Sequence, residues 1–137
     1  MTGPAPAQLH ALTLPGVPGS VREFRALARA AAATPYQAEA AALCVSELAT
    51  NAIVHTLSGW PGQTVTVEIE PARRPGELRI SVIDAGPRWT VPGAEPDPDP
   101  SNGYGLGIVD AVAAEWGVLH AAGGGSCSWC EIPEAAL

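Results

Sequence analysis

The sequence predicts an α/β (α+β) two-layer sandwich, in which a mixed, largely antiparallel sheet carries helices on one face. Two observations lead to this prediction. Segments with apolar residues at every second position, typical of half-buried strands, share the chain with segments whose apolar residues recur every three or four positions, as on one side of a helix. Short turns join consecutive strand segments, which favours antiparallel pairing over a doubly wound parallel sheet.

The first half of the chain predicts one strand and two helices. Ser20 and Glu23 have the spacing of a capping box, and apolar residues at helical spacing follow them. Thr34 is a suitable cap for a further helix, because Pro35 would then occupy its first position. The expected elements are a strand at 9–14 and helices at 20–33 and 35–56.

The second half predicts two hairpins and a helix between them. Alternating Val and Ile residues and the turn at 73–76 mark the first hairpin, and three consecutive glycines mark the second. Acidic residues alternate with proline over 95–100, a pattern that fits neither a helix nor a central strand. The expected elements are strands at 64–70, 78–83, 118–121 and 126–132, and a helix at 105–116.

Length and composition fit one domain with one core. The chain has 137 residues, of which 47% are hydrophobic. We expect residues 9–137 to form that domain and residues 1–8, rich in Pro and Ala, to be a flexible N-terminus. The sequence contains neither a membrane-spanning run nor the pattern of a signal peptide, so we expect a cytoplasmic protein with no membrane partner.

The charged residues exclude several classes of protein. The net charge is −7, and all seven basic residues other than histidine are arginines. An acidic chain is a poor match for phosphate backbones, so a nucleic-acid partner is disfavoured. Because the chain has no lysine, it is neither a P-loop NTPase, nor a Schiff-base enzyme, nor a protein kinase of the usual type.

The C-x-x-C formed by Cys127 and Cys130 is a weak metal or redox signal. Both lie in the predicted strand 126–132, and residues three apart on a strand point to opposite faces. We therefore expect ordinary packing cysteines, and Cys44 in an apolar helix is expected in the core.

Polar residues on the long helix form the first cluster that could carry chemistry. Glu47, Asn51 and His55 are spaced four apart and share one side of the helix. The Asn51 carbonyl oxygen could bind Mg²⁺ while Glu47 accepts a proton. The alternative for this cluster alone is a solvated polar stripe.

Two further clusters follow along the chain. Asp84 ends an apolar strand, where it could accept a hydrogen bond from an exocyclic amine, and Gly86 could let a planar ring approach the backbone. The glycines of 103–107 precede a helix, where backbone N–H groups can face a phosphate. Taken singly, these clusters also fit an ordinary turn and a flexible hinge.

The order of the three clusters resembles the histidine-kinase-like (GHKL) ATP-binding domain, with its Bergerat-type fold, which gyrase, Hsp90 chaperones, sensor histidine kinases and MutL share. The chain has Glu-x-x-x-Asn on a helix, Asp-x-Gly at a strand end and then a glycine-rich helix entry. The sequence from Ser46 to Thr56, the Gly-Leu-Gly-Ile-Val helix and Trp-Gly-Val at 116–118 are similar to the anti-sigma-factor serine/threonine kinases of bacteria. The resemblance covers roughly residues 9–133.

The resemblance implies a role for individual residues. Glu47 would be the general base, and Asn51 would bind Mg²⁺ and the phosphates of ATP. Asp84 would recognise the adenine amino group, with Gly86 beside the ring. The ATP lid would span 87–102, and its glycine-rich end would bind the phosphates through the remaining predicted site residues, Gly103, Gly105, Leu106 and Gly107. Thr50 and His55 would lie near the site.

The resemblance also implies partners. These would be a sigma factor and a STAS-type anti-sigma antagonist phosphorylated on Ser or Thr, and the protein could form a homodimer through its first strand and helix. Two departures keep an alternative open: Arg88 replaces the last glycine of Asp-x-Gly-x-Gly, and the acidic lid residues Asp97 and Asp99 would repel a triphosphate. The chain is therefore either such a kinase or a nucleotide-binding module that acts through protein contacts without turnover. A detached sensor-kinase catalytic domain and a free-standing ATPase are weaker alternatives.

Overall fold

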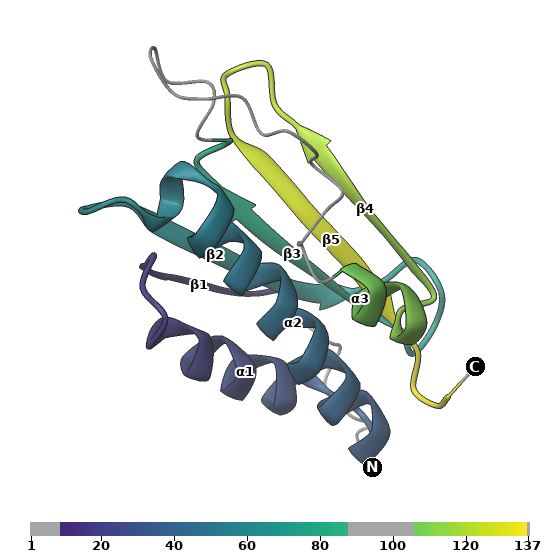
Figure 1. The fold of residues 1–137 in the computed structure, drawn as a ribbon. Helices are drawn as coiled ribbons and strands as arrows, with labels where there is room; N and C mark the ends of the chain where they lie inside the picture. The colour runs from purple at the N-terminus through teal and green to yellow at the C-terminus, as the bar shows by residue number, and fades with distance from the viewer. Residues whose placement is uncertain (1–8, 88–105, 137) are drawn as a thin grey trace.

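The computed structural model describes residues 9–87 and 106–136 (Figure 1). The expected flexible N-terminus at 1–8 lies outside these residues. The order of elements along the chain is the predicted one. The elements are β1 (His10–Pro15), α1 (Ser20–Ala31), α2 (Pro35–His55), the 3-10 turn η1 (Leu57–Gly59), β2 (Thr64–Pro71), β3 (Leu78–Asp84), α3 (Leu106–Val112), β4 (Glu115–His120) and β5 (Ser126–Ile132).

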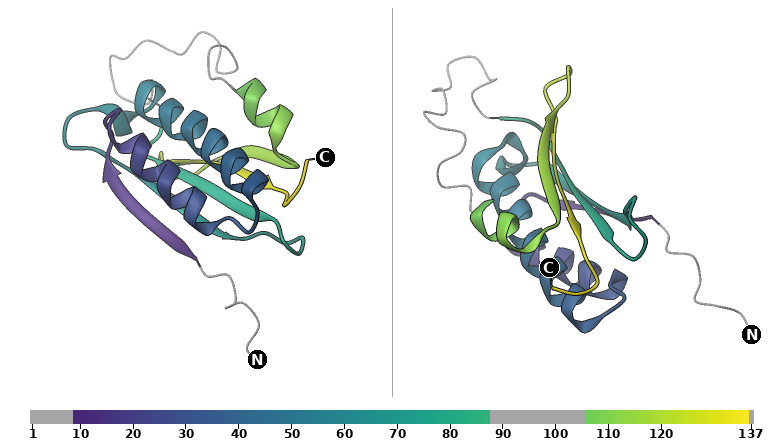
Figure 2. Two further views of the ribbon diagram at one scale, coloured as in Figure 1. Left: turned by 90° about the horizontal axis from the view of Figure 1, so that it is seen from below. Right: turned by 90° about the vertical axis from the view of Figure 1, so that its right-hand side faces the viewer.

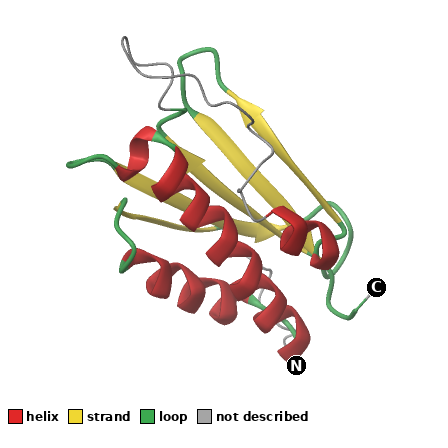
Figure 3. Cartoon of the chain, in the orientation of Figure 1, coloured by secondary structure: helices red, strands yellow, loops and turns green. Residues whose placement is uncertain are grey.

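The described strands form one five-stranded sheet in the order β1-β2-β3-β5-β4. Each neighbouring pair in that order is antiparallel. The three α-helices lie on the same face of the sheet, with α1 and α2 side by side (Figures 2 and 3). The predicted fold class, a two-layer sandwich with helices on one face, is confirmed.

The core lies between the helices and the sheet, where the alternation of each strand directs apolar side chains. On β2 and β3 every second residue is fully or almost fully buried, as the period of two requires. Phe24 and Ala28 on α1 and a broad apolar face of α2 cover these strands. The largest fully buried side chains include Phe24, Leu48, Ile69, Ile80 and Ile132.

Gln37 fixes the beginning of α2 against the sheet. The helix begins as predicted, with Thr34 as its cap and its side chain accepting from the Gln37 N–H at 3.1 Å. The fully buried Gln37 side chain donates to the Gly76 carbonyl at 2.9 Å and to the Ile132 carbonyl at 3.0 Å. These bonds join α2 to the β2–β3 turn and to the end of β5.

The predicted capping box at Ser20 is wrong. Gly19 is the cap of α1 and provides no side-chain bond, while Ser20 is already helical. The Ser20 hydroxyl donates instead to the Pro15 carbonyl at 2.6 Å, where it holds the end of β1 against the helix. The hydroxyl that the local pattern assigned to the helix cap thus makes a tertiary contact instead. Helix α1 also ends earlier than predicted, at Ala31 rather than at 33.

The last helix is shorter than predicted, and the strand after it is longer. Helix α3 ends at Val112, and β4 already begins at Glu115. The Ala114 N–H donates to the Glu131 carbonyl at 2.9 Å, so pairing with β5 replaces the next helical turn. Trp116, predicted to be helical, lies on β4 and donates from Nε1 to Asp110 Oδ1 at 2.8 Å.

The cysteines are free thiols, as expected. Cys130 is fully buried on the helix side of β5, where its thiol contacts Cys44 of α2. Cys127 is half-buried on the other face, in register with Ile83 of β3. In the described part of the chain, no helix is both long and apolar enough to span a membrane.

Candidate functional site

Asp84 is a buried acid at the end of β3, with 8% of its surface exposed. Its Oδ1 accepts from the Ser126 hydroxyl at 2.6 Å and from the Gly86 N–H at 2.7 Å. Burial raises the pKa of the Asp84 carboxyl, while the bonds from Ser126 and Gly86 oppose part of that rise. A carboxylate has about four acceptor positions, so acceptor capacity remains for a ligand.

The turn after Asp84 is tied to the end of α2. Ser58 accepts from the Ala85 N–H at 2.9 Å, and the Leu57 N–H donates to the Gly86 carbonyl at 2.9 Å. Thr56 also forms a β-bridge with Pro87. These bonds hold the acid of the sheet beside the C-terminal turns of the helix.

Position 86 requires glycine because of its backbone conformation and because another loop lies very close to it. Its φ is +96°, and a Cβ at this position would lie 1.6 Å from the Gly124 carbonyl oxygen. The turn therefore packs directly against the β4–β5 loop. This contact explains the glycine without any role in ligand binding. The expected approach of the adenine ring to Gly86 therefore stays a prediction.

A cavity of about 250 Å³ opens between α2, the Asp84 turn, α3 and the last hairpin. Its size is near the lower end of small-molecule sites, at about 300 Å³. Ala52, Leu106 and Val118 supply apolar walls, and Asp84 supplies an acid. The remaining lining residues are Asn51, His55, Thr56, Pro87, His120, Ser126 and Ser128.

The structure brings several of the predicted site residues together. Asn51, Asp84 and Leu106 line the cavity, as does the predicted neighbour His55. Thr50, also expected near the site, instead lines a hollow between α1 and α2.

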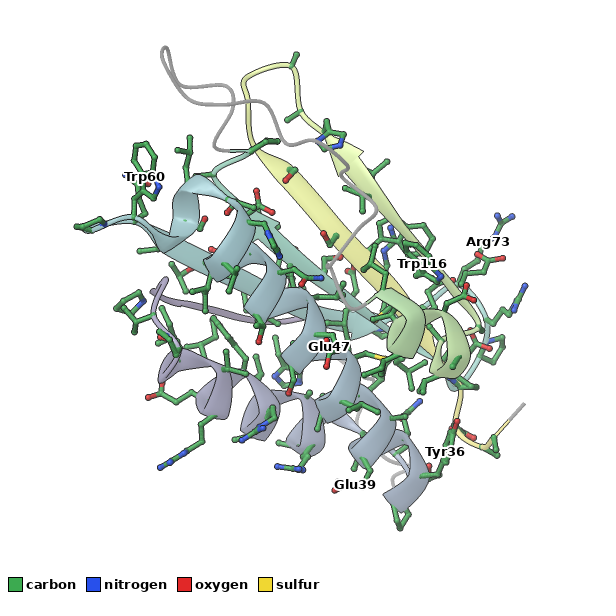
Figure 4. The ribbon with its side chains drawn as sticks, in the orientation of Figure 1. Tyr36, Glu39, Glu47, Trp60, Arg73 and Trp116 are labelled. Atoms are coloured by element: carbon green, nitrogen blue, oxygen red, sulfur yellow. The ribbon has the colours of Figure 1, made fainter. Side chains whose placement is uncertain are left out.

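Glu47 lies midway along α2 (Figure 4), one helical turn before Asn51 and about 6 Å away along the axis. It is half-buried and does not line the cavity. Glu47 is therefore next to the cavity on the side away from the Asp84 turn.

The glycine-rich segment falls only partly within the described residues. Gly107 is exposed in the first turn of α3, and a Cβ there would meet open space. The predicted lid at 87–102 is described only at Pro87. The remaining predicted residues Gly103, Gly105, Arg88, Asp97 and Asp99 lie outside the described residues.

The cavity also contains residues that the sequence analysis did not select. His120 and Ser126 are register partners, and Ser126 is in turn the partner of Asp84, so the three form a row across the helix-side face of the sheet. Val118, Ser128 and Val82 form the next row. Alternation along 126–132 already placed Ser126 and Ser128 on one face, but their register with Asp84 requires the sheet.

The cavity fits the purine end of ATP. A buried carboxylate beside apolar walls can accept from an exocyclic amine, and Asp84 retains the acceptor capacity to do so. In the described ranges, no three His, Cys, Asp or Glu side chains form a metal cluster. Asn51, which lines the cavity, could hold a Mg²⁺ ion through its side-chain carbonyl oxygen, and Mg²⁺ commonly keeps phosphate oxygens and water among its ligands.

Comparison with known protein families identifies a match over most of the chain. The model of the family described as the histidine kinase-like ATPase domain matches residues 13–128. This range contains every described residue that lines the cavity. No curated protein matches the chain.

Proposed function

The chain belongs to the histidine kinase-like ATPase domain family, and on this premise we propose that it is an ATP-dependent serine/threonine protein kinase that regulates a sigma factor. It phosphorylates a STAS-type antagonist on Ser or Thr and, as an anti-sigma factor, binds the sigma factor when the antagonist does not compete. The sequence similarity at 46–56 and 103–118 to anti-sigma kinases supports this more specific function.

The observation that carries the proposal is the Asp84 carboxylate in the wall of the cavity that Asn51 also lines. Asp84 is held by Ser126 and Gly86, so its position is fixed before a ligand arrives. A fixed acceptor for the adenine amine sets the orientation of the base. The triphosphate then extends along α2 from Asn51 toward Glu47.

Glu47 acts as the general base in this proposal. The hydroxyl oxygen of the antagonist bonds to the γ-phosphorus as the bond from that phosphorus to the β–γ bridging oxygen breaks, and ADP leaves. The hydroxyl proton passes to the Glu47 carboxylate. Glu47 lies one helical turn before Asn51 and outside the cavity wall, a place that suits a base acting on the terminal phosphate of a triphosphate that extends along α2.

Asn51 is the residue that would hold Mg²⁺, through its side-chain carbonyl oxygen. The bound ion would neutralise charge on the phosphate oxygens. Within the described residues the cavity wall contains neither Arg nor Lys, so this neutralisation matters for binding the triphosphate.

The same feature favours a second candidate function. A cavity wall whose described residues include neither Arg nor Lys, and a Glu47 that does not line it, also suit a module that binds nucleotide and acts through its partners without turnover. In both functions the protein is cytoplasmic and acts by protein contacts. A homodimer through β1 and α1 stays a prediction.

Phosphotransfer separates the two functions. The purified chain is incubated with radiolabelled ATP, Mg²⁺ and candidate STAS-type proteins, and calorimetry records its nucleotide affinity. The kinase predicts a labelled antagonist, no label with Glu47→Gln and full activity with Glu115→Gln, a matched change at an exposed position of β4 that lines neither the cavity nor the hollows beside α1. ATP binding and sigma-factor binding without label would establish the module instead. Failure of the folded chain to bind ATP would refute both.

A further inference from the structure

We propose that the seam between α1 and α2 is a docking surface for an acidic amphipathic helix of a partner protein. This surface, which we call the α1–α2 seam, consists of two adjoining hollows of about 600 and 270 Å³. Arg25 belongs to both hollows and joins them. The inference is independent of nucleotide binding.

The seam lies on the other side of α2 from the nucleotide cavity. Asn51, Ala52 and His55 line the cavity, whereas the intervening residues Ile53 and Val54 line the larger hollow. Successive helix residues are turned by about 100°, so the two groups point in nearly opposite directions. A partner can therefore occupy the seam while nucleotide occupies the cavity.

The seam exposes an apolar side chain of α2 in each hollow, with the polar side chains of Ser46 and Thr50 between them. Leu43 lines the smaller hollow with 43% of its surface exposed, and Val54 lines the larger with 50% exposed. They are eleven residues apart, or about 16 Å along α2. Positions 43, 50 and 54 keep the heptad spacing by which helices pack side by side. A partner helix of three to four turns matches this length.

The side of the seam formed by α1 is rich in arginine. Arg22, Arg25 and Arg29 are spaced three and four residues apart on this helix. They represent three of the seven basic side chains, other than histidine, in a chain of net charge −7. The carboxylates that line the hollows are Glu23 and Glu39. Glu39 lies 3.2 Å from Arg29, in an exposed pair that solvent weakens.

Arg25 provides a specific reason for an acidic partner. Its Nε is buried with no hydrogen-bond partner among the described residues. An unsatisfied buried donor is costly, so turning the guanidinium toward an incoming carboxylate would relieve that cost. Arginine also binds carboxylates in pairs of parallel hydrogen bonds. The occupant is thus a helix with an apolar stripe and carboxylates along the flank that meets α1.

The probe is a designed helical peptide of about 15 residues with leucines at heptad spacing and glutamates on one flank. Amide chemical shifts map its site on the full chain, and fluorescence anisotropy gives its affinity. One control peptide has lysine in place of each glutamate, and another has serine in place of each leucine. We expect the acidic peptide to shift amides of α1 and α2 and to bind at least about tenfold more tightly than either control.

Protein variants test the arginines. Arg22→Glu with Arg25→Glu should weaken the acidic peptide by at least about tenfold. The matched control is Arg73→Glu with Arg74→Glu in the exposed β2–β3 turn, which makes the same change of charge and should leave the affinity within about twofold. Circular dichroism confirms that both variants fold.

Three results would overturn the inference. One is no binding of the acidic peptide at about 1 mM. The second is equal binding of the serine control, which would make the seam a general site for polyanions. The third is a concentration-dependent dimer in sedimentation that the acidic peptide dissociates, because a second copy of the chain would then be the occupant of the seam. Calorimetry with ATP on the same samples reports the proposed function separately.

Discussion

Replacement of Asp84 by asparagine is the most informative single change. The two side chains have nearly the same shape, and the asparagine oxygen can still accept from Ser126 and Gly86, which are 2.6 and 2.7 Å from the acid. The charge disappears, and an N–H₂ group takes the place of the second carboxylate oxygen. The change therefore removes an acceptor for the adenine amine without removing volume.

The expected loss of affinity follows from the kind of bond that is removed. A hydrogen bond to a charged group contributes about 1.5–3 kcal/mol, which corresponds to about 10- to 150-fold in Kd. The introduced amide donor also faces the amine donor of adenine and, in contrast, suits the O6 acceptor of guanine. The ratio of ATP affinity to GTP affinity should therefore fall further than ATP affinity alone.

Stability should change in the opposite direction. Asp84 is 8% exposed, and burial raises its pKa, which means that the ionised carboxylate is less favourable in the folded protein than in the unfolded chain. A neutral isostere removes this cost, so the Tm of Asp84→Asn should equal or exceed that of the parent. Loss of binding then cannot be ascribed to unfolding.

Calorimetry with ATP and GTP in the presence of Mg²⁺, together with thermal melting, checks both expectations. Asp110→Asn is the matched control, since Asp110 is exposed on α3 and does not line the cavity. An unchanged ATP affinity in folded Asp84→Asn would refute the assignment of Asp84 to the adenine amine. A large fall in Tm would refute the reasoning about its burial.

Three further predictions concern stability. Because the folded-state pKa of Asp84 is raised, the native protein retains a proton that the unfolded chain has lost, so the contribution of Asp84 to stability should fall as pH rises from about 4 through the raised folded-state pKa. Urea titrations should show that the stability of Asp84→Asn relative to the parent increases over this pH range, and parallel profiles would contradict this. Gln37→Leu leaves two carbonyls without the amide that binds them and should lower the free energy of unfolding by about 2–4 kcal/mol. The control Gln63→Leu, at an exposed position, should change the free energy of unfolding by less than about 0.5 kcal/mol, and similar values for the two variants would show that the buried bonds contribute little. Gly86→Ala should lower the free energy of unfolding by more than about 1 kcal/mol, because Gly86 has a φ of +96° and contacts the β4–β5 loop. Gly123→Ala, whose Cβ would meet open space, is the control in thermal melting, and equal Tm values for the two variants would disprove the close approach.

The fold class and most elements could be predicted from local pattern. Apolar residues alternate with other residues along β2 and β3, so the sequence predicts which face of the sheet each side chain lies on before the neighbouring strands are known. Thr34 and Pro35 form a local cap, which needs no tertiary contact and was predicted correctly. Asp84 and Asn51 were selected from their positions at a strand end and on a helix, and the structure places both on one cavity.

The tertiary structure decided where competing bonds were available. Ser20 had two possible partners, a cap N–H and the Pro15 carbonyl, and the fold brings the second within 2.6 Å. The helix periodicity after Val112 could not show that Ala114 would pair with Glu131, because that pairing depends on the register of β5. For the same reason, Ser126 and His120 could be assigned to the site only once the register of the sheet was known. A sequence specifies which groups face the same way along one element, but which groups meet across elements is set by packing and register.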